Sequence, residues 1–151
     1  MLTGATPVLV HNCGPVYSEI VDGRRGVAYA EVSPQTLADA SARRIGSEPG
    51  TRKPHGFRSG VGDSRGHLIG RQFGGDGHDM RNIIVQGGAQ NNGAISTAED
   101  VIAAHVRSSG NTIIMSVTPI YGAAKYRATH VRIEAVDDFG WSFDSGEIPN
   151  F

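Results

Sequence analysis

The stretch from Ser64 to Gly75, Ser-Arg-Gly-His-Leu-Ile-Gly-Arg-Gln-Phe-Gly-Gly, contains the pattern that decides the fold. His67 stands directly after a glycine, where the backbone lets a ligand approach closely. Polar side chains follow at spacings that suit one compact site: Asn82, Gln86, Asn91 and Glu99. An imidazole can deprotonate a water, while a carboxamide oxygen on a following helix can hold a hard divalent cation. The pattern therefore favours a site in which one base and one metal act on a phosphate ester.

These residues resemble the core of the DNA/RNA non-specific endonucleases of the ββα-metal (His-Me finger) superfamily. In the bacterial branch, the core has Arg-Gly-His-Leu-Ile, Phe-Gly-Gly, Asn-Leu-Val-Pro-Gln and an Asn-x-Gly-Ala helix that ends in Glu. The last two elements stand here as Asn82–Gln86 and Asn91–Glu99, in the same order and with the same internal spacing. The resemblance implies an α+β fold, with a ββα-metal nuclease core, a small antiparallel sheet and one main helix.

The resemblance also implies roles for the motif residues. His67 is the expected general base, and Asn91 is the expected sole direct protein ligand of the metal. Mg²⁺ suits such a site, with Mn²⁺ as an alternative, because Mg²⁺ keeps several waters and uses few protein ligands. Glu99 would lie roughly 12 Å further along a helix than Asn91 and would act outside the inner coordination sphere. The neighbouring Asn92 is the alternative ligand if the register differs by one residue.

Two further amides, Asn82 and Gln86, are expected to orient the base or to tie its loop to the helix. Arg65 is expected to bind the phosphate or to stabilise its extra negative charge during cleavage. Arg58 and Arg71 are further candidates for contacts with nucleic acid. Each role has a plain structural alternative, namely a loop hydrogen bond for the amides and a solvated surface charge for the arginines.

One position departs from the family. The family has Asp directly before Arg-Gly-His, whereas this chain has Ser64 there and Asp63 one residue earlier. The departure keeps open a second function, a catalytically inactive nucleic-acid or partner-binding module on the same fold. A third possibility is an RNA-directed toxin with a metal-free mechanism. A zinc site at His67 and His78 is a weak alternative, because the sequence supplies neither cysteine partners nor a His-Glu-x-x-His helix.

The beginning of the chain carries a second pattern, Thr-Gly-Ala-Thr-Pro-Val-Leu-Val-His-Asn-Cys, from Thr3 to Cys13. It resembles the C-terminal end of the Hint (intein-like) autoprocessing domains that precede polymorphic toxins. In that chemistry, the Asn12 amide attacks its own carbonyl, helped by His11, and the chain is cut before Cys13. The resemblance implies a Hint stub over residues 1–12 and a toxin domain over residues 13–151. It also implies a secreted bacterial effector, delivered into target cells, with a cognate immunity protein as partner.

Composition sets broad limits on the protein. A chain of 151 residues fits one domain with a single core. No stretch approaches the roughly 18 consecutive apolar residues that span a bilayer, so no membrane segment is expected. No export signal is recognisable at the start, so an export signal would be expected on a larger precursor. The lone Cys13 excludes an intramolecular disulfide and a cysteine-rich zinc site.

Charge is distributed unevenly along the chain, although the formal net charge is only −1. Between Arg43 and Arg81 there are eight basic side chains against four acidic ones, and from Glu134 onward only acids occur. The basic region coincides with the motif, which favours a surface that faces the phosphates of a DNA or RNA substrate.

Apolar spacing and turn residues predict the elements in chain order. They are a strand over Gly26–Ser33 stopped by Pro34, a helix over Gln35–Arg44, a loop over Gly46–Gly62, a short strand at His67–Ile69, a helix over Asn92–Ser108, and strands over Thr112–Val117 and Thr129–Val136. The tail from Asp137 either packs through Trp141 and Phe143 or frays.

The long helix is the most strongly patterned element. Apolar residues recur near helical spacing at Ile95, Ala98, Ile102 and Val106, and Gly110 supplies a C-terminal stop. A capping box formed by Ser96 and Glu99 would start the helix later. We prefer the longer helix because the apolar stripe continues through the proposed cap.

Overall fold

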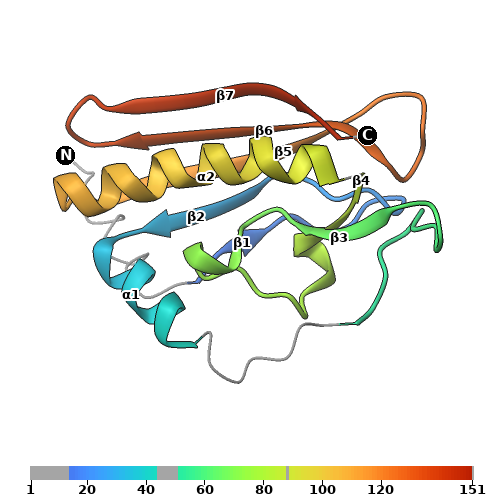
Figure 1. Ribbon diagram of the computed structural model, residues 1–151, viewed down its shortest axis with the longest axis horizontal. Helices are drawn as coiled ribbons and strands as arrows, with labels where there is room; N and C mark the ends of the chain where they lie inside the picture. Colours follow the sequence, from blue (N-terminus) through green and yellow to red (C-terminus); the bar gives the residue numbers. More distant parts are fainter. Residues whose placement is uncertain (1–13, 44–50, 88, 151) are drawn as a thin grey trace, which may run out of the picture.

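The protein combines a five-stranded antiparallel sheet with a long helix and a separate two-stranded ribbon (Figure 1). The computed structural model describes residues 14–43, 51–87 and 89–150, with only the backbone described for residues 89–92. The sheet has the order β1-β2-β5-β6-β7. Its strands are β1 (Val16–Tyr17), β2 (Ala28–Val32), β5 (Ile113–Tyr121), β6 (Ala128–Asp137) and β7 (Ser142–Pro149). The predicted α+β class is confirmed.

The ribbon and the long helix follow one another directly in the chain. Strand β3 (Asp63–His67) pairs antiparallel with β4 (Ile83–Gly87), and His67 lies opposite Ile83. Two short 3-10 helices, η2 (Arg71–Phe73) and η3 (Met80–Asn82), lie in the connection between the two strands. Helix α2 (Ala89–Ser109) comes next. The order strand, strand, helix is the one expected for a ββα-metal core.

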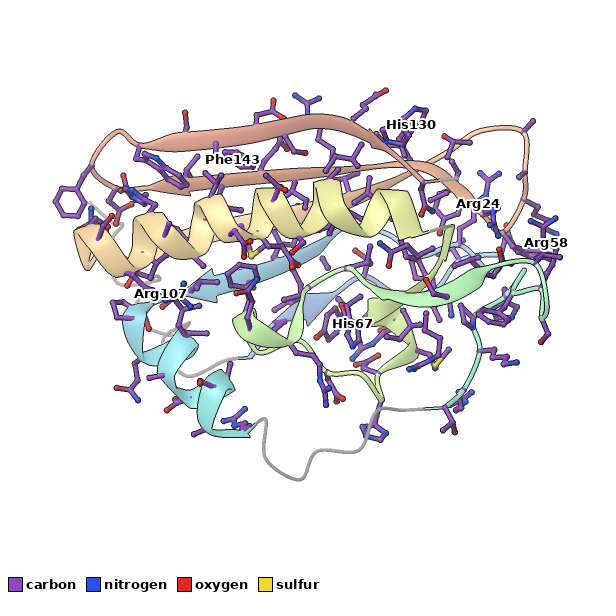
Figure 2. All side chains as sticks on the ribbon, viewed as in Figure 1. Arg24, Arg58, His67, Arg107, His130 and Phe143 are labelled. Carbon is purple, nitrogen blue, oxygen red and sulfur yellow. The ribbon has the colours of Figure 1, made fainter. Side chains whose placement is uncertain are left out.

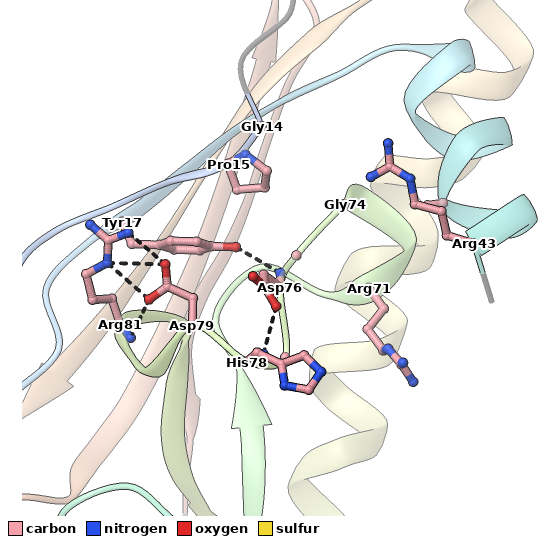
Figure 3. Close-up of a pocket in the computed structure, with 13 residues that line it drawn as sticks. Gly14, Pro15, Tyr17, Arg43, Arg71, Gly74, Asp76, His78, Asp79 and Arg81 are labelled. Atoms are coloured by element: carbon pink, nitrogen blue, oxygen red, sulfur yellow. Dashed lines mark hydrogen bonds and ion pairs between the residues drawn. The ribbon is translucent and has the colours of Figure 1, made fainter. Parts of the chain in front are cut away.

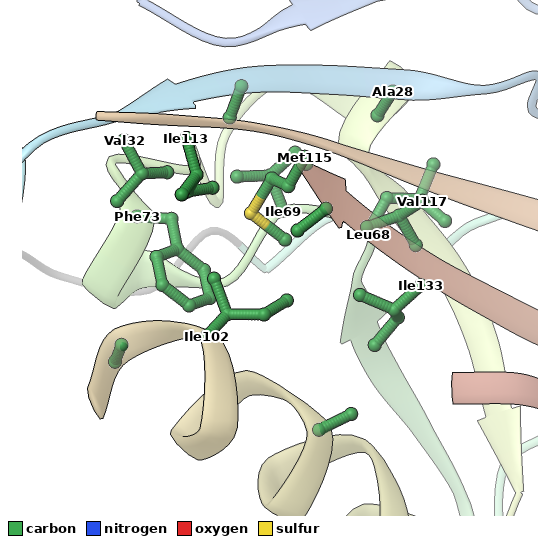
Figure 4. Packing of buried hydrophobic residues seen from close by; sticks show 14 of the residues in the cluster. Ala28, Val32, Leu68, Ile69, Phe73, Ile102, Ile113, Met115, Val117 and Ile133 are labelled. Carbon is green, nitrogen blue, oxygen red and sulfur yellow. The ribbon is translucent and has the colours of Figure 1, made fainter. Parts of the chain in front are cut away.

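Helix α2 is longer than predicted and begins at Ala89 rather than Asn92. The alternative start at Ser96 is therefore wrong. The predicted apolar stripe is confirmed, because Ala98, Ile102 and Val106 are buried against the sheet. Figure 4 shows the ring of Phe73 from η2 between Ile102 of α2 and the sheet residues Val32 and Ile113. This contact packs the loop that follows His67 against both layers of the core.

Pro34 ends the strand β2, as predicted, and also begins helix α1 (Pro34–Arg43). The Ser33 hydroxyl accepts a hydrogen bond from the Thr36 backbone N–H at 3.1 Å, and the Thr36 hydroxyl accepts one from the Ser33 N–H at 3.0 Å. These reciprocal bonds satisfy backbone donors at the start of the helix, where Pro34 lacks an N–H of its own. Leu37 and Ala40 bury the inner face of the helix.

Three strands were not predicted. Strand β4 is Ile-Ile-Val-Gln-Gly and is buried along its whole length, so it shows no alternation of polar and apolar residues. Strand β7 is largely polar and contains Gly146, and it forms because it pairs with β6. The two-residue β1 is too short to show a pattern. The tail therefore does not fray, and Trp141 and Phe143 pack against the core.

Other predicted elements differ mainly in their ends. Strands β5 and β6 are confirmed and extend further than predicted, toward the turn that joins them. The predicted strand at His67–Ile69 is wrong for its last two residues, because β3 ends at His67 and the chain then bends. Leu68 and Ile69 are nevertheless buried at 2% and 0% exposure. Their apolar character reflects core packing rather than a strand.

Asn150 joins the C-terminal end of the chain to the ribbon. Its side-chain NH₂ donates to the carbonyl oxygens of Val85 and Ala128, both at 2.9 Å. Its Oδ1 accepts from the Gly87 N–H at 3.3 Å, and the residue is 1% exposed. Asn150 thereby ties the end of β4 to the start of β6 in the five-stranded sheet. Within the described residues, no helix is long and apolar enough to cross a membrane.

Candidate active site

His67 lies at the end of β3, where the ribbon meets the first half of α2. Figure 2 shows it beside β3, on the side of the molecule away from the His130 and Phe143 side chains of β6 and β7. It lines a pocket of about 390 Å³, which we call the catalytic pocket. The pocket is lined by Arg65, His67, Gly70, Arg71, Gln72, Gln86, Ile95, Ser96, Glu99 and Asp100. Five residues that the sequence predicted for the site therefore meet at one place: His67, Arg65, Arg71, Gln86 and Glu99.

The surroundings of His67 keep its imidazole neutral. Burial lowers its pKa below the ordinary value of 6.5, and the positive charges of Arg65 and Arg71 lower it further. Asp76 opposes this shift with a smaller effect. Its Nε2 atom is buried and has no hydrogen-bond partner in the described part of the chain. A neutral imidazole can accept a proton, as a general base must.

Asn82 fixes the backbone that follows His67. Its Oδ1 accepts from the Ile69 N–H at 2.8 Å, and its NH₂ donates to the carbonyls of Ile69 at 3.1 Å and Asp76 at 3.0 Å. Its own carbonyl accepts from the Leu68 N–H at 2.8 Å. Asn82 is fully buried, and its side-chain amide makes three of these bonds to the backbone of the loop. The residue acts on the shape of the loop and does not itself line the catalytic pocket.

Glu99 faces the same pocket from α2. Burial raises the pKa of its carboxyl group to about 7, and a hydrogen bond from Gln72 at 3.4 Å only partly offsets this. A Cβ atom on Gly70 would lie 2.5 Å from Glu99 Oε1, so any larger residue at this position would clash with the carboxylate. Neither Gly70 nor Gln72 was singled out from the sequence, although both belong to the quoted motif. Their roles depend on a contact with a helix almost thirty residues later in the chain.

The three predicted arginines have different surroundings. Arg65 donates from Nε to the Arg52 carbonyl at 2.6 Å and from Nη2 to the Gly77 carbonyl at 2.8 Å. It therefore holds two loops together at the edge of the catalytic pocket. Arg71 is exposed and lines the pocket. Arg58 does not line it, and Figure 2 shows Arg58 at a distance from His67, near the start of β3.

The carboxylate that precedes the motif has a structural partner. The side chain of Asp63 is only 1% exposed and pairs with Arg127 at 2.5 Å. It also accepts from the Arg58 backbone N–H at 2.8 Å. The hydrogen bond from Arg127 lowers the pKa of Asp63 to about 2 against the opposing effect of burial. Asp63 thus joins the start of β3 to the chain just before β6. The neighbouring Ser64 donates its hydroxyl to the Gln86 carbonyl at 3.2 Å.

Comparisons with known proteins identify the family. The family model of DNA/RNA non-specific endonucleases matches residues 17–138, most of the chain. The chain belongs to this family. It is therefore an endonuclease, an enzyme that hydrolyses phosphodiester bonds of nucleic acids. No curated protein matches it.

Solved structures share the fold of this endonuclease at low sequence identity. NucA from Streptococcus agalactiae with a magnesium ion bound has a TM-score of 0.75 at 19% identity, over 93% of this chain and 74% of that one. The Sda1 nuclease with a bound zinc ion has a TM-score of 0.72 at 16% identity, over 91% and 74% of the two chains. An extracellular endonuclease has a TM-score of 0.56 at 18% identity, over 91% and 67%.

The catalytic pocket of the endonuclease fits a hard divalent cation. Its lining includes the Glu99 carboxylate and the amides of Gln72 and Gln86, which are oxygen donors of the kind that Mg²⁺ prefers. A cation there would stabilise the ionised form of the partly buried Glu99. No group of three or more His, Cys, Asp or Glu side chains in the described residues could hold a metal.

The residue predicted to bind the metal can be placed only by its backbone. Asn91 and Asn92 lie in the first turn of α2, and their side chains are outside the described residues. His78 lines a different hollow from His67, so the weak zinc alternative has no support from the pockets. His11, Asn12 and Cys13 also lie outside the described residues.

Proposed function

We propose that the protein is an Mg²⁺-dependent endonuclease that cuts DNA, RNA or both, with His67 as the general base. The observation that carries the proposal is the half-buried imidazole of His67, whose lowered pKa favours its neutral form and which shares a pocket with the Glu99 carboxylate and the Arg71 guanidinium. Support for the metal comes from the oxygen donors of this pocket and from the magnesium bound in NucA. Asn91 would hold the cation directly, and Glu99 would act through its water shell.

The residues of the chain divide the work of hydrolysis. His67 takes a proton from water, and this water attacks phosphorus in line with the departing 3′ oxygen. Arg71 and Arg65 supply positive charge that stabilises the negative charge developing on the phosphate. The metal, when bound, would stabilise the phosphate oxygens and the leaving group. The family resemblance implies products with 5′-phosphate and 3′-hydroxyl ends.

A plasmid-nicking assay tests this proposal. The purified protein should cut DNA or RNA with Mg²⁺ and should stop when EDTA is added. His67→Ala should keep the fold, judged by circular dichroism and thermal melting, and lose roughly 10²- to 10⁴-fold in rate. A folded variant with near wild-type turnover would remove His67 from the mechanism. Binding of nucleic acid without any cleavage would favour the inactive binding module instead, and cleavage in EDTA would favour a metal-free reaction.

We also propose that this endonuclease is the toxic C-terminal domain of a secreted bacterial polymorphic toxin. The support is the Hint-like pattern over Thr3–Cys13, directly upstream of the nuclease. Residues 1–12 would be the Hint stub and residues 13–151 the toxin domain. A fold shared with an extracellular endonuclease is compatible with action outside the producing cell. A cell that makes such a nuclease needs a cognate immunity protein, which would be its specific partner.

The processing step has a direct test. When the chain is joined to its native upstream domain, it should be cut between Asn12 and Cys13. Because the Asn12 amide must cyclise onto its own carbonyl, Asn12→Ala should abolish release, and His11→Ala should slow it. Neither change should alter the nuclease activity of a fragment that begins at Cys13. Intact mass of the released fragment decides the matter, since any other N-terminal residue would contradict the Hint assignment and leave the nuclease untouched.

A further inference from the structure

A second hollow, of about 520 Å³, adjoins the catalytic pocket. We call it the Arg43 hollow, after a residue at the end of α1 that lines it and does not line the catalytic pocket. Its other walls come from β1 and from the loop between η2 and η3. Arg71 lines both the hollow and the catalytic pocket, so the two spaces meet at this side chain.

One wall of the Arg43 hollow is electrically balanced. Figure 3 shows Tyr17, Asp79 and Arg81 together on this side. Arg81 donates to both oxygens of Asp79, with the shorter contact at 2.7 Å, and forms an ion pair with Glu19 at 3.1 Å. Its guanidinium also lies over the Tyr17 ring, 5.7 Å from the centroid. The charge of Arg81 is therefore taken up by carboxylates of the protein.

The opposite wall carries two further guanidinium groups. In Figure 3, Arg43 and Arg71 lie on this side, facing the hollow from α1 and from η2. Both side chains are exposed. Arg43 has no ion pair with a carboxylate among the described residues. Asp76 lies between the two walls, and its negative charge opposes the positive charge of the arginines. Its Oδ1 accepts from the His78 N–H at 2.7 Å.

We propose that the Arg43 hollow binds the phosphodiester backbone of the nucleic-acid strand beyond the bond that is cut. The proposal rests on the proposed nuclease function and names where the rest of the substrate lies. A polymer whose scissile phosphate sits beside His67 must leave the catalytic pocket, and the hollow begins at Arg71, where that pocket ends. A guanidinium group can bind phosphate oxygens through two N–H groups. Positively charged side chains along a groove bind the backbone of a nucleic-acid strand whatever its base sequence.

The position of the charges favours a nucleic acid over an acidic peptide. Arg71 is close enough to His67 to lower the pKa of the imidazole, so one guanidinium acts on the reacting site and also faces the hollow. A strand bound there would be continuous with the scissile bond. An acidic peptide in the same place would compete with the substrate and would act as an inhibitor rather than as an extension of it.

Binding of a short fluorescein-labelled DNA strand to the full chain, in the His67→Ala background that slows cleavage, tests the proposal. Arg43→Ala should weaken binding by roughly threefold or more at low salt and reduce the slope of log affinity against log salt by about one, as loss of one phosphate contact does. Arg43→Lys should keep the slope. Asp76→Asn, which removes the opposing charge and keeps an acceptor for the His78 N–H, should strengthen binding.

The matched control is Arg107→Ala, since Arg107 is an exposed arginine on α2 that lines neither space. It should leave both affinity and slope unchanged. An Arg43→Ala variant that binds DNA like its parent, with the same salt slope, would overturn the proposal. Equal losses for Arg43→Ala and Arg107→Ala would also overturn it, because they would show only a general effect of net charge.

Catalysis separates this inference from the nuclease proposal itself. With His67 present, Arg43→Ala should raise KM for long DNA and leave the turnover of bis(p-nitrophenyl) phosphate unchanged, because this small diester occupies only the catalytic pocket. If the wild-type protein cuts DNA and Arg43→Ala has the same KM, the strand does not use the hollow. If the wild-type protein cuts neither substrate, it is the nuclease proposal that fails.

Discussion

The imidazole of His67 illustrates how a single residue is prepared for proton transfer. It ends a strand, so its backbone is fixed by pairing with Ile83, and the next turn is fixed by hydrogen bonds to Asn82. Burial and two nearby guanidinium groups keep the ring neutral. The Nε2 atom is buried and has no hydrogen-bond partner within the described residues.

The metal ligand gives the sharpest test at this scale. Asn91→Ala should raise the Mg²⁺ concentration needed for half-maximal activity by at least about tenfold, the lower end of what loss of an outer-shell partner costs. Asn92→Ala should have a much smaller effect, because the proposal makes Asn91, and not its neighbour, the direct ligand of the metal. Mg²⁺ titrations of cleavage rate give both numbers. A larger metal defect in the Asn92 variant would show that the assigned register is off by one.

The motif predicted part of the lining of the catalytic pocket, but not the environments of its residues. His67, Arg65, Arg71, Gln86 and Glu99 line the pocket, whereas Asn82 and Arg58 do not. The hydrogen bond from Gln72 to Glu99 was missed because it joins residues far apart in the chain. The pairing of Asp63 with Arg127 was missed for the same reason. Local patterns carry no information on which distant side chain will be in contact.

At the scale of elements, the loop between β3 and β4 depends on close backbone packing at Gly75. A Cβ atom there would lie 1.8 Å from the Ile69 carbonyl oxygen and 3.0 Å from that of Gly70. The Gly75 N–H donates to the Gly70 carbonyl at 3.1 Å, so the loop cannot open without losing this bond. The second glycine of Phe-Gly-Gly is therefore required by the shape of the loop that carries the site.

Gly75→Ala should lower the free energy of unfolding by at least about 1–3 kcal/mol, the usual cost of forcing extra atoms into packed structure. Gly93→Ala is the matched control, because a Cβ atom on this helical glycine meets nothing within 4 Å. It should raise stability by up to about 1 kcal/mol through helix propensity. Urea unfolding of both variants provides the comparison. Similar stabilities for the two would contradict the close contact at Gly75.

Elements with a clear period were predictable, and elements defined by their neighbours were not. The apolar stripe of α2 and the alternation in β5 and β6 are properties of the sequence itself. Strand β4 is buried on both faces, and β7 is mostly polar, so neither shows a strand pattern. Each is stabilised by pairing with a neighbouring strand: β4 pairs with β3, and β7 pairs with β6.

At the scale of the whole molecule, two buried carboxylates join parts that the sheet alone would not hold together. Asp63 links the ribbon to the chain before β6 through Arg127. Asp137, at the end of β6, accepts hydrogen bonds from His105 of α2 at 2.8 Å and from Asn111 at 3.1 Å. His105 also stacks on Trp141, with ring centroids 3.8 Å apart. The ribbon and the far end of α2 are thus each tied to the sheet through one ionised side chain.

These carboxylates determine how stability should depend on pH. Hydrogen bonds from Arg127 and from His105 help to lower the pKa of Asp63 and Asp137 to about 2, against the opposing effect of burial. Between pH 3.8 and about pH 2 the unfolded chain therefore binds more protons than the folded chain. The free energy of unfolding decreases as the pH falls through this range. The raised pKa of Glu99 has the opposite effect, because it increases stability as the pH falls from about 7 to 4.5. The lowered pKa of His67 counters this gain below pH 6.5.

The free energy of unfolding should therefore change little between pH 7 and pH 5 and fall steeply below about pH 4. Asp63→Asn should be less stable at pH 7, because Arg127 loses its counterion, and should lose less stability on further acidification. Asp144→Asn is the control: this carboxylate is 46% exposed in its pair with Arg132, so solvent and salt screen the interaction. Urea unfolding across the pH range measures all three proteins. An Asp63→Asn variant with the wild-type acid dependence would show that this buried pair does not control acid stability.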